Sequence, residues 1–233
     1  MNKSILIIFF SFIISGCVSP GKTNTNFIDA TKHSVKNEKY FEKDPGVVWD
    51  ILVRELSKSF FMINNIDKES RIINVSYSSN NLCRYVDCGK VNIEVKKSTL
   101  NKMGQSSYDF GICESNSYIT EGSSPNQSGI PAPIICLNTR RPKLEGRMNI
   151  YIAPEGKGTL VTVNSRYVLD IKLKAECDFY APAGTLVGSR QENMSYECSF
   201  DSRKPDMCQP AKGEPFMCYS KGTLEREILS LIN

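Results

Sequence analysis

One stretch of the chain, residues 144–175, constrains the fold more than any other. It reads LEGRMNIYIAPEGKGTLVTVNSRYVLDIKLKA, with a turn-forming segment, PEGKG, at 154–158. The apolar positions that alternate before the turn are Leu144, Met148, Ile150 and Ile152. The return strand covers 160–163 and 167–173. Alternation with a period of two is typical of strands with one buried face, so we predict a long antiparallel hairpin here.

Two segments have helical spacing instead. Asp44 is a good N-cap and Pro45 suits the first helical position, so a helix should follow over 46–60. The apolar stripe of this helix is Val48, Ile51, Leu52 and Leu56. The tail 219–233 predicts a second, amphipathic helix. Its apolar face is Leu224, Ile228, Leu231 and Ile232.

Further strands complete a prediction of fold class. The segment FFMINNIDKESRIINVSYSS at 60–79 indicates a hairpin, and GKVNIEVKK at 89–97 indicates another strand. The segments 98–143 and 178–197 are polar and predict loop insertions. We therefore expect an α+β fold, with an antiparallel sheet covered on one face by an N-terminal and a C-terminal helix and with disulfide-clamped loop insertions.

The N-terminus has the features of an export signal. Lys3 precedes a hydrophobic run from Ile5 to Ile14, which is too short to span a bilayer. The run ends in Ile14-Ser15-Gly16-Cys17, which resembles the bacterial lipobox. The resemblance implies that 1–16 is a lipoprotein signal peptide and that Cys17 is acylated. Val18, rather than Asp, follows Cys17, which by analogy with enteric bacteria favours delivery to the outer membrane.

The residues after the signal suggest how the chain is divided. Residues 18–40 are polar and lack a sustained apolar period. We expect a lipidated flexible tether over 17–40 and a single α+β domain over 41–233. Two or more acyl chains give a stable anchor, so membrane lipid would hold the chain through Cys17.

The remaining cysteines are even in number. They are Cys83, Cys88, Cys113, Cys136, Cys177, Cys198, Cys208 and Cys218. Cysteines of an exported chain pair in an oxidising compartment, although the sequence alone does not fix which pairs form. Cys113–Cys136 and Cys177–Cys198 would each clamp a polar loop. The other four permit either the local pairs Cys83–Cys88 and Cys208–Cys218 or the crossed pairs Cys83–Cys208 and Cys88–Cys218.

The order of elements resembles the helix-grip domains of BamC-type lipoproteins, which attach to the outer-membrane barrel-assembly machine. The pieces RYVDCG at 84–89, VNSRYVL at 163–169 and CYSKGTLEREIL at 218–229 resemble uncharacterised proteobacterial outer-membrane lipoproteins. In those proteins a cysteine in the DCG position recurs with one before the C-terminal helix. The resemblance therefore implies the crossed pairing, with Cys88 bonded to Cys218.

Catalytic and metal-binding motifs are missing from the sequence. It has none of the motifs G-x-S-x-G, H-E-x-x-H and G-x-x-x-x-G-K-[ST], and its one histidine is His33. Cys83-x4-Cys88 has a spacing found at zinc sites, but no second tight pair and no nearby histidine accompany it. We expect no enzyme activity, no cofactor and no metal. A net charge of +4 without a basic block also gives no indication of nucleic acid binding.

These features suggest a location more than an activity. We expect an outer-membrane lipoprotein facing the periplasm, acting as a non-enzymatic scaffold or envelope-assembly factor that binds another envelope protein. The alternative is a helix-grip-type binder of a lipid or small apolar ligand. A third hypothesis is a hydrolase that uses carboxylates alone.

Overall fold

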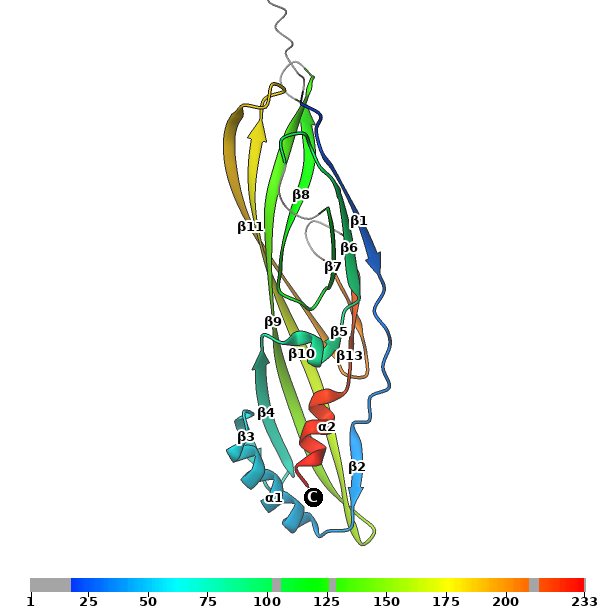
Figure 1. Ribbon diagram of the computed structural model, residues 1–233. Coiled ribbons are helices and arrows are strands. Elements are labelled where there is room, and N and C mark those ends of the chain that lie inside the picture. Colours follow the sequence, from blue (N-terminus) through cyan, green and yellow to red (C-terminus); the bar gives the residue numbers. More distant parts are fainter. Residues whose placement is uncertain (1–17, 102–105, 126–128, 210–213, 233) are drawn as a thin grey trace, which may run out of the picture.

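A hairpin that runs the length of an elongated molecule forms the centre of the fold (Figure 1). The computed structural model describes residues 18–101, 106–125, 129–209 and 214–232. Strand β9 (Pro131–Glu155) and strand β10 (Gly158–Tyr180) pair antiparallel along almost their whole length. Gly156, at φ 57°, makes the turn between them. The hairpin predicted over 144–175 is confirmed, and both of its strands continue beyond the predicted ends.

Different strands flank the two halves of this hairpin. In the half next to Gly156, the turn half, β9 pairs with β4 (Ile72–Ser79), β4 pairs with β3 (Met62–Asp67), and β10 pairs with β2 (Glu38–Phe41). In the other half, the distal half, β9 pairs with β8 (Asn116–Pro125) and β10 with β11 (Leu186–Asp201). These seven strands form one antiparallel sheet.

Two helices cover the turn half (Figure 1). Helix α1 (Pro45–Lys58) begins where the Asp44 side chain accepts a hydrogen bond from the Gly46 amide at 2.8 Å. Helix α2 (Thr223–Ser230) follows Gly222, whose φ is 64°. The helices bury side chains completely against the sheet, among them Leu52, Leu56, Leu224 and Ile228. Both predicted helices are confirmed.

The predicted fold class is confirmed only in part. The antiparallel sheet and both helices are present, but strands predominate over the described ranges, and the helices cover one half of the long sheet. The other half is faced by a second sheet, built from β1 (Lys22–Ile28), β6 (Lys90–Lys96) and β7 (Ser107–Gly111). This sheet has its own small core of Val91, Ile93, Val95 and Phe110, with Tyr108 and Tyr118 packed against it.

The flexible tether predicted over 17–40 is wrong for the part that the structure describes. Strand β1 pairs with β6 along its whole length, and the Val18 amide donates to the Pro182 carbonyl at 3.0 Å. His33 Nε2 lies 3.2 Å from the Asp87 carboxylate. The segment lacks apolar periodicity because backbone hydrogen bonds, rather than buried side chains, hold it as an edge strand. The predicted signal peptide, 1–16, and the lipidation residue Cys17 lie outside the described residues.

The two loop insertions are also wrong as predictions. The segment 98–143 contains β7, β8 and the distal part of β9, and the segment 178–197 contains most of β11. The β11 residues are mostly exposed in its first part, so the strand carries little apolar alternation. Hydrogen bonds to β10 hold this segment as a strand, and a polar sequence alone does not predict that pairing.

A middle region, which we call the waist, joins the two halves. It contains the short helix η1 (Leu82–Arg84) and a small sheet in which β13 (Phe216–Ser220) pairs with β5 (Val86–Asp87) and with β12 (Asp206–Cys208). Figure 1 shows β5 and β13 beside the middle of β10. Segments from distant parts of the sequence therefore meet at the waist.

Four disulfides link the cysteines that were predicted to pair. They are Cys83–Cys113, Cys88–Cys218, Cys136–Cys177 and Cys198–Cys208. The Cys88–Cys218 bond agrees with the pairing that the family resemblance implied. The pairings Cys113–Cys136, Cys177–Cys198 and Cys83–Cys208 are wrong.

The error in pairing follows from the error in the insertions. A loop clamp requires the ends of one polar segment to meet, whereas these segments run as strands. Cys136 lies directly opposite Cys177 in the register of β9 and β10, with a Cα–Cα distance of 4.0 Å. Cross-strand neighbours at that separation are within disulfide reach, so register rather than loop closure selects the pair.

A buried polar contact fixes α2 on the sheet. The Tyr167 hydroxyl lies 3.0 Å from the Ser220 hydroxyl and donates to Glu225 Oε2 at 3.4 Å, and all three residues are buried. The other carboxylate oxygen, Glu225 Oε1, has no hydrogen-bond partner within the described ranges. Burial and the nearby Glu225 carboxylate raise the pKa of Tyr167, so this phenol stays protonated and acts as a donor.

Replacing Tyr167 with phenylalanine should lower the free energy of unfolding by about 2 kcal/mol, because a buried acceptor loses its donor. Chemical denaturation of the variant measures the loss. Glu225→Gln supplies the control, since Tyr167→Phe should cost less in that background if the two groups interact. Equal losses in both backgrounds would show that the Tyr167 hydroxyl acts through Ser220 and not through Glu225.

Candidate functional site

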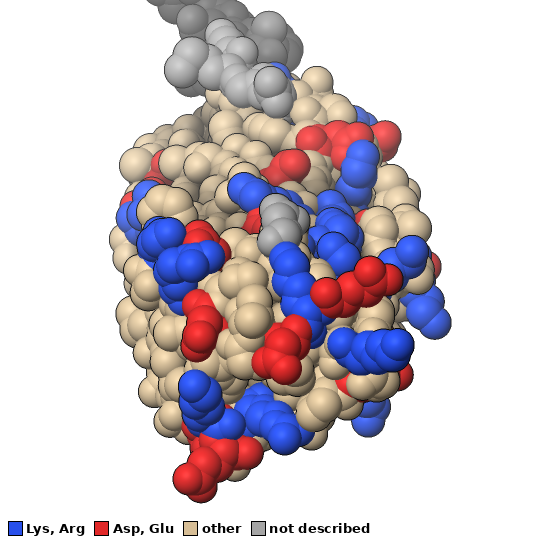
Figure 2. Space-filling model, turned by 90° about the horizontal axis from the view of Figure 1, so that it is seen from below, with Lys and Arg blue, Asp and Glu red and all other residues tan. Residues whose placement is uncertain are grey.

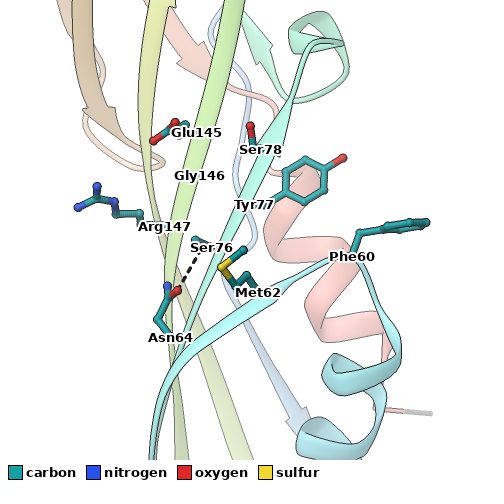
Figure 3. A pocket seen from close by; sticks show the side chains of 9 residues that line it. All are labelled: Phe60, Met62, Asn64, Ser76, Tyr77, Ser78, Glu145, Gly146 and Arg147. Carbon is teal, nitrogen blue, oxygen red and sulfur yellow. Dashed lines mark hydrogen bonds between the residues drawn. The ribbon is translucent and has the colours of Figure 1, made fainter.

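The outer face of the sheet, opposite the helices, carries a groove of about 720 Å³ (Figure 3). We call it the outer groove. Its lining comes from β3, β4, β9 and one residue of the segment that follows α1. The lining residues are Phe60, Met62, Asn64, Ser76, Tyr77, Ser78, Glu145, Gly146 and Arg147.

The side chains of three paired strands, β3, β4 and β9, explain the outer groove. Met62 on β3 lies opposite Ser76 on β4, which lies opposite Arg147 on β9. Ser78 lies opposite Glu145 in the same way. Serine on the middle strand is short, while the neighbouring strands carry longer side chains. A hollow therefore runs along β4 between two raised rows.

Two large apolar side chains stand at the rim of the outer groove. Phe60 is 96% exposed and Met62 is 68% exposed. Figure 3 shows the Phe60 ring projecting away from the sheet. The residue between them, Phe61, instead turns inward, where its ring packs on Tyr77 with a centroid distance of 5.5 Å. Alternation along an extended chain therefore places Phe60 and Met62 in solvent.

A second hollow of about 720 Å³ adjoins the outer groove through Arg147. We call it the basic hollow, and its lining includes four cations and one carboxylate. These charged residues are Arg147, Arg166, Arg203, Lys204 and Asp201. Arg147 and Arg166 lie directly opposite each other on β9 and β10. Like charges placed opposite each other on a sheet repel, so an anion bound here would relieve the repulsion.

Charge is distributed differently at the end of the molecule where the helices lie. Figure 2 shows that end, and Lys and Arg alternate there with Asp and Glu over the visible face. The mixture of signs gives no extended field of one charge. The basic hollow differs from this mixed surface, because four of its five charged lining residues are cations.

The described carboxylates bear on the hydrolase hypothesis. Within the described ranges, no group of three or more His, Cys, Asp or Glu side chains could hold a metal ion. The buried carboxylate Glu225 contacts the hydroxyl of Tyr167, and its second oxygen faces no hydrogen-bond partner there. This contact does not provide the pair of carboxylates that glycoside hydrolysis uses.

The sequence did not point to Phe60, Met62 or the basic hollow. The segment 60–67 is predicted only as one strand of a hairpin, and Arg147 and Arg166 lie inside the long hairpin, where they alternate with buried residues. The run FFM did indicate exposed apolar residues. Neighbouring residues on a strand face opposite sides, so at least one of these three large apolar side chains must face outward.

Comparison with protein-family models, with curated proteins and with solved structures found no match to this chain. Over the described residues, every helix is too short or too polar to cross a membrane.

Proposed function

We propose that this protein is a non-enzymatic lipoprotein of the outer membrane that faces the periplasm and binds another envelope protein on its outer face. The single observation that carries the proposal is the exposure of Phe60 and Met62 at the rim of the outer groove. Large exposed apolar side chains beside a groove are typical of protein-binding surfaces.

The neighbouring charges indicate what kind of partner would fit. The outer groove offers apolar contacts, and the adjoining basic hollow offers Arg147, Arg166, Arg203 and Lys204. A partner segment with an apolar side chain followed by Asp or Glu would meet both surfaces. Such complementarity would speed encounter and fix the orientation of the bound partner.

The course of the chain supports a role at a distance from the bilayer. Val18, the residue after the proposed anchor Cys17, is bonded to Pro182 at the distal end of the hairpin. Phe179 and Arg166 lie on the same strand, β10, thirteen residues apart. At about 3.4 Å per residue, the basic hollow lies roughly 45 Å from that end. A lipid at Cys17 would hold the outer face away from the membrane surface.

The ligand-binding alternative does not fit the contact between helices and sheet. Leu52, Leu56, Leu224 and Ile228 are completely buried there, so side chains fill the space that a helix-grip ligand would need. The resemblance to BamC-type lipoproteins remains part of the proposal at the level of an assembly role.

Photo-crosslinking in intact envelopes tests the proposed surface. A photoreactive residue in place of Met62 should give a protein adduct, because this position lies at the rim of the outer groove. Met207 is the matched control, since it is 48% exposed on β12, outside the outer groove. The adduct at position 62 should weaken at least about tenfold when Arg147 and Arg166 are both changed to Glu.

Three outcomes would count against the proposal. They are an equal adduct pattern at positions 62 and 207, adducts to lipid alone, and a position-62 adduct that is indifferent to Arg147→Glu and Arg166→Glu. The last outcome would remove the acidic partner, and the first two would remove the protein partner itself.

A further inference from the structure

A separate cavity lies in the distal half, between the second sheet and the long hairpin. Its volume is about 230 Å³. One wall comes from the second sheet, with Ile93 and Phe110, and the other comes from β10 and β13, with Leu173 and Phe216. The walls are therefore mainly apolar, as in sites that bind small molecules.

One cation lies inside this apolar cavity. Arg140 on β9 lines it and is only 7% exposed. Its Nη2 donates to the Tyr196 hydroxyl at 3.4 Å, and its Nε has no hydrogen-bond partner in the part of the chain that the structure describes. No carboxylate among those residues lies within ion-pair distance of Arg140. Burial lowers the pKa of Arg140, which reflects the loss of hydration.

A buried cation without a counterion is costly, because the protein supplies little of what water supplied. The flanking groups do not remove that cost, since Tyr118 and Tyr196 are neutral phenols. Burial raises the pKa of both phenols, while the charge of Arg140 acts in the opposite direction. Their hydroxyls can therefore donate hydrogen bonds, together with Arg140, to an anion placed between them.

We propose that this cavity binds a small amphiphilic carboxylate, with its anionic head on Arg140 and its apolar tail between the two sheets. The size of the cavity limits the ligand. At about 30 Å³ per water molecule, it has room for roughly eight waters, or for a ligand of about ten non-hydrogen atoms. A diacyl lipid is several times larger, so the site suits a free short-chain or aromatic acid.

Glu214 is the carboxylate among the residues that line this cavity. It lines the same cavity, yet it is exposed and makes no ion pair with Arg140 within 4.0 Å. A bound carboxylate would supply the charge that Glu214 does not. Glu214→Gln should therefore leave ligand affinity unchanged or increase it.

The probe is octanoate, which is compared with its neutral analogue octanol by titration of the full chain purified from membranes in detergent. Wild type should bind octanoate at least about tenfold more tightly than octanol, and Arg140→Gln should abolish that preference. Arg141→Gln is the matched control, because Arg141 is the next residue on β9 and is exposed on the opposite face. The control also accounts for uptake of either probe by detergent.

A measurement without ligand keeps the proposal testable if binding is weak. Arg140→Leu should raise the midpoint of thermal unfolding of the ligand-free protein, because an uncompensated charge is removed. A lower midpoint, or equal affinity of wild type for octanoate and octanol, would mean that Arg140 serves the fold and would overturn the proposal. Neither result bears on Met62 crosslinking, so the two proposals fail separately.

Discussion

Removal of the disulfide that crosses the waist, by Cys88→Ala with Cys218→Ala, should lower the free energy of unfolding by about 5 kcal/mol. The two cysteines are 130 residues apart in the sequence. In the chain-entropy model a bond closing such a loop restricts the unfolded chain by about that amount. Both cysteines are also buried in the main core, so the loss of their sulfur atoms adds to the effect.

The bond between Cys198 and Cys208 provides the comparison. It closes a separation of only 10 residues, yet Cys208 is as deeply buried as Cys218, and their sulfur atoms lie 3.8 Å apart. Cys198→Ala with Cys208→Ala should therefore cost about 3 kcal/mol. Guanidinium unfolding of both double variants measures the difference. Equal losses would show that loop length does not control the contribution of these bonds.

Gly89→Ala should lower the free energy of unfolding by about 3 kcal/mol, a large loss for a single substitution. Gly89 follows Cys88 at the waist and has φ +81°, which disfavours any side chain. A Cβ atom there would lie 2.2 Å from the Ile28 carbonyl oxygen and 3.0 Å from the Ala30 nitrogen. Because backbone atoms are in the way, relief requires the end of β1 to move.

Gly156→Ala separates the two causes. Gly156 also has a positive φ, +57°, but a Cβ atom there would meet no other atom within 4 Å. This variant should cost about 1 kcal/mol, from backbone conformation alone. Denaturation of both variants gives the comparison, and limited proteolysis near residue 28 should detect the release of β1 in Gly89→Ala. A loss at Gly89 no larger than that at Gly156 would contradict the proposed clash.

The sequence predicted the turn half of the molecule far better than the distal half. In the turn half, β9, β10 and the helices bury one face, and Leu144 to Ile152 therefore alternate visibly. In the distal half, β1 and β11 are held by pairing with neighbouring strands and expose most of their side chains. Such strands show no apolar alternation in the sequence. The polar segments 22–28 and 178–197 therefore predict a tether and a loop.

The disulfides and the proposed sites depend on register, which sequence patterns do not give. Cys136 meets Cys177, and Arg147 meets Arg166, because a turn at Gly156 sets which residues of β9 and β10 face each other. Arg140 belongs to a short basic cluster, TRRPK at 139–143, and such a cluster in a polar segment predicts a solvated loop and no site. Only the second sheet, folding over it, encloses its side chain.

The long β9–β10 ladder also has a mechanical consequence. Val18 is bonded at one end of this ladder, and the outer groove lies beside its other half. If residue 17 is tethered and a partner pulls on the groove, the load runs parallel to the strands. Cross-strand hydrogen bonds loaded in shear resist together instead of breaking one after another. The hairpin would then act as a stiff tie that transmits tension between the bilayer and the bound partner.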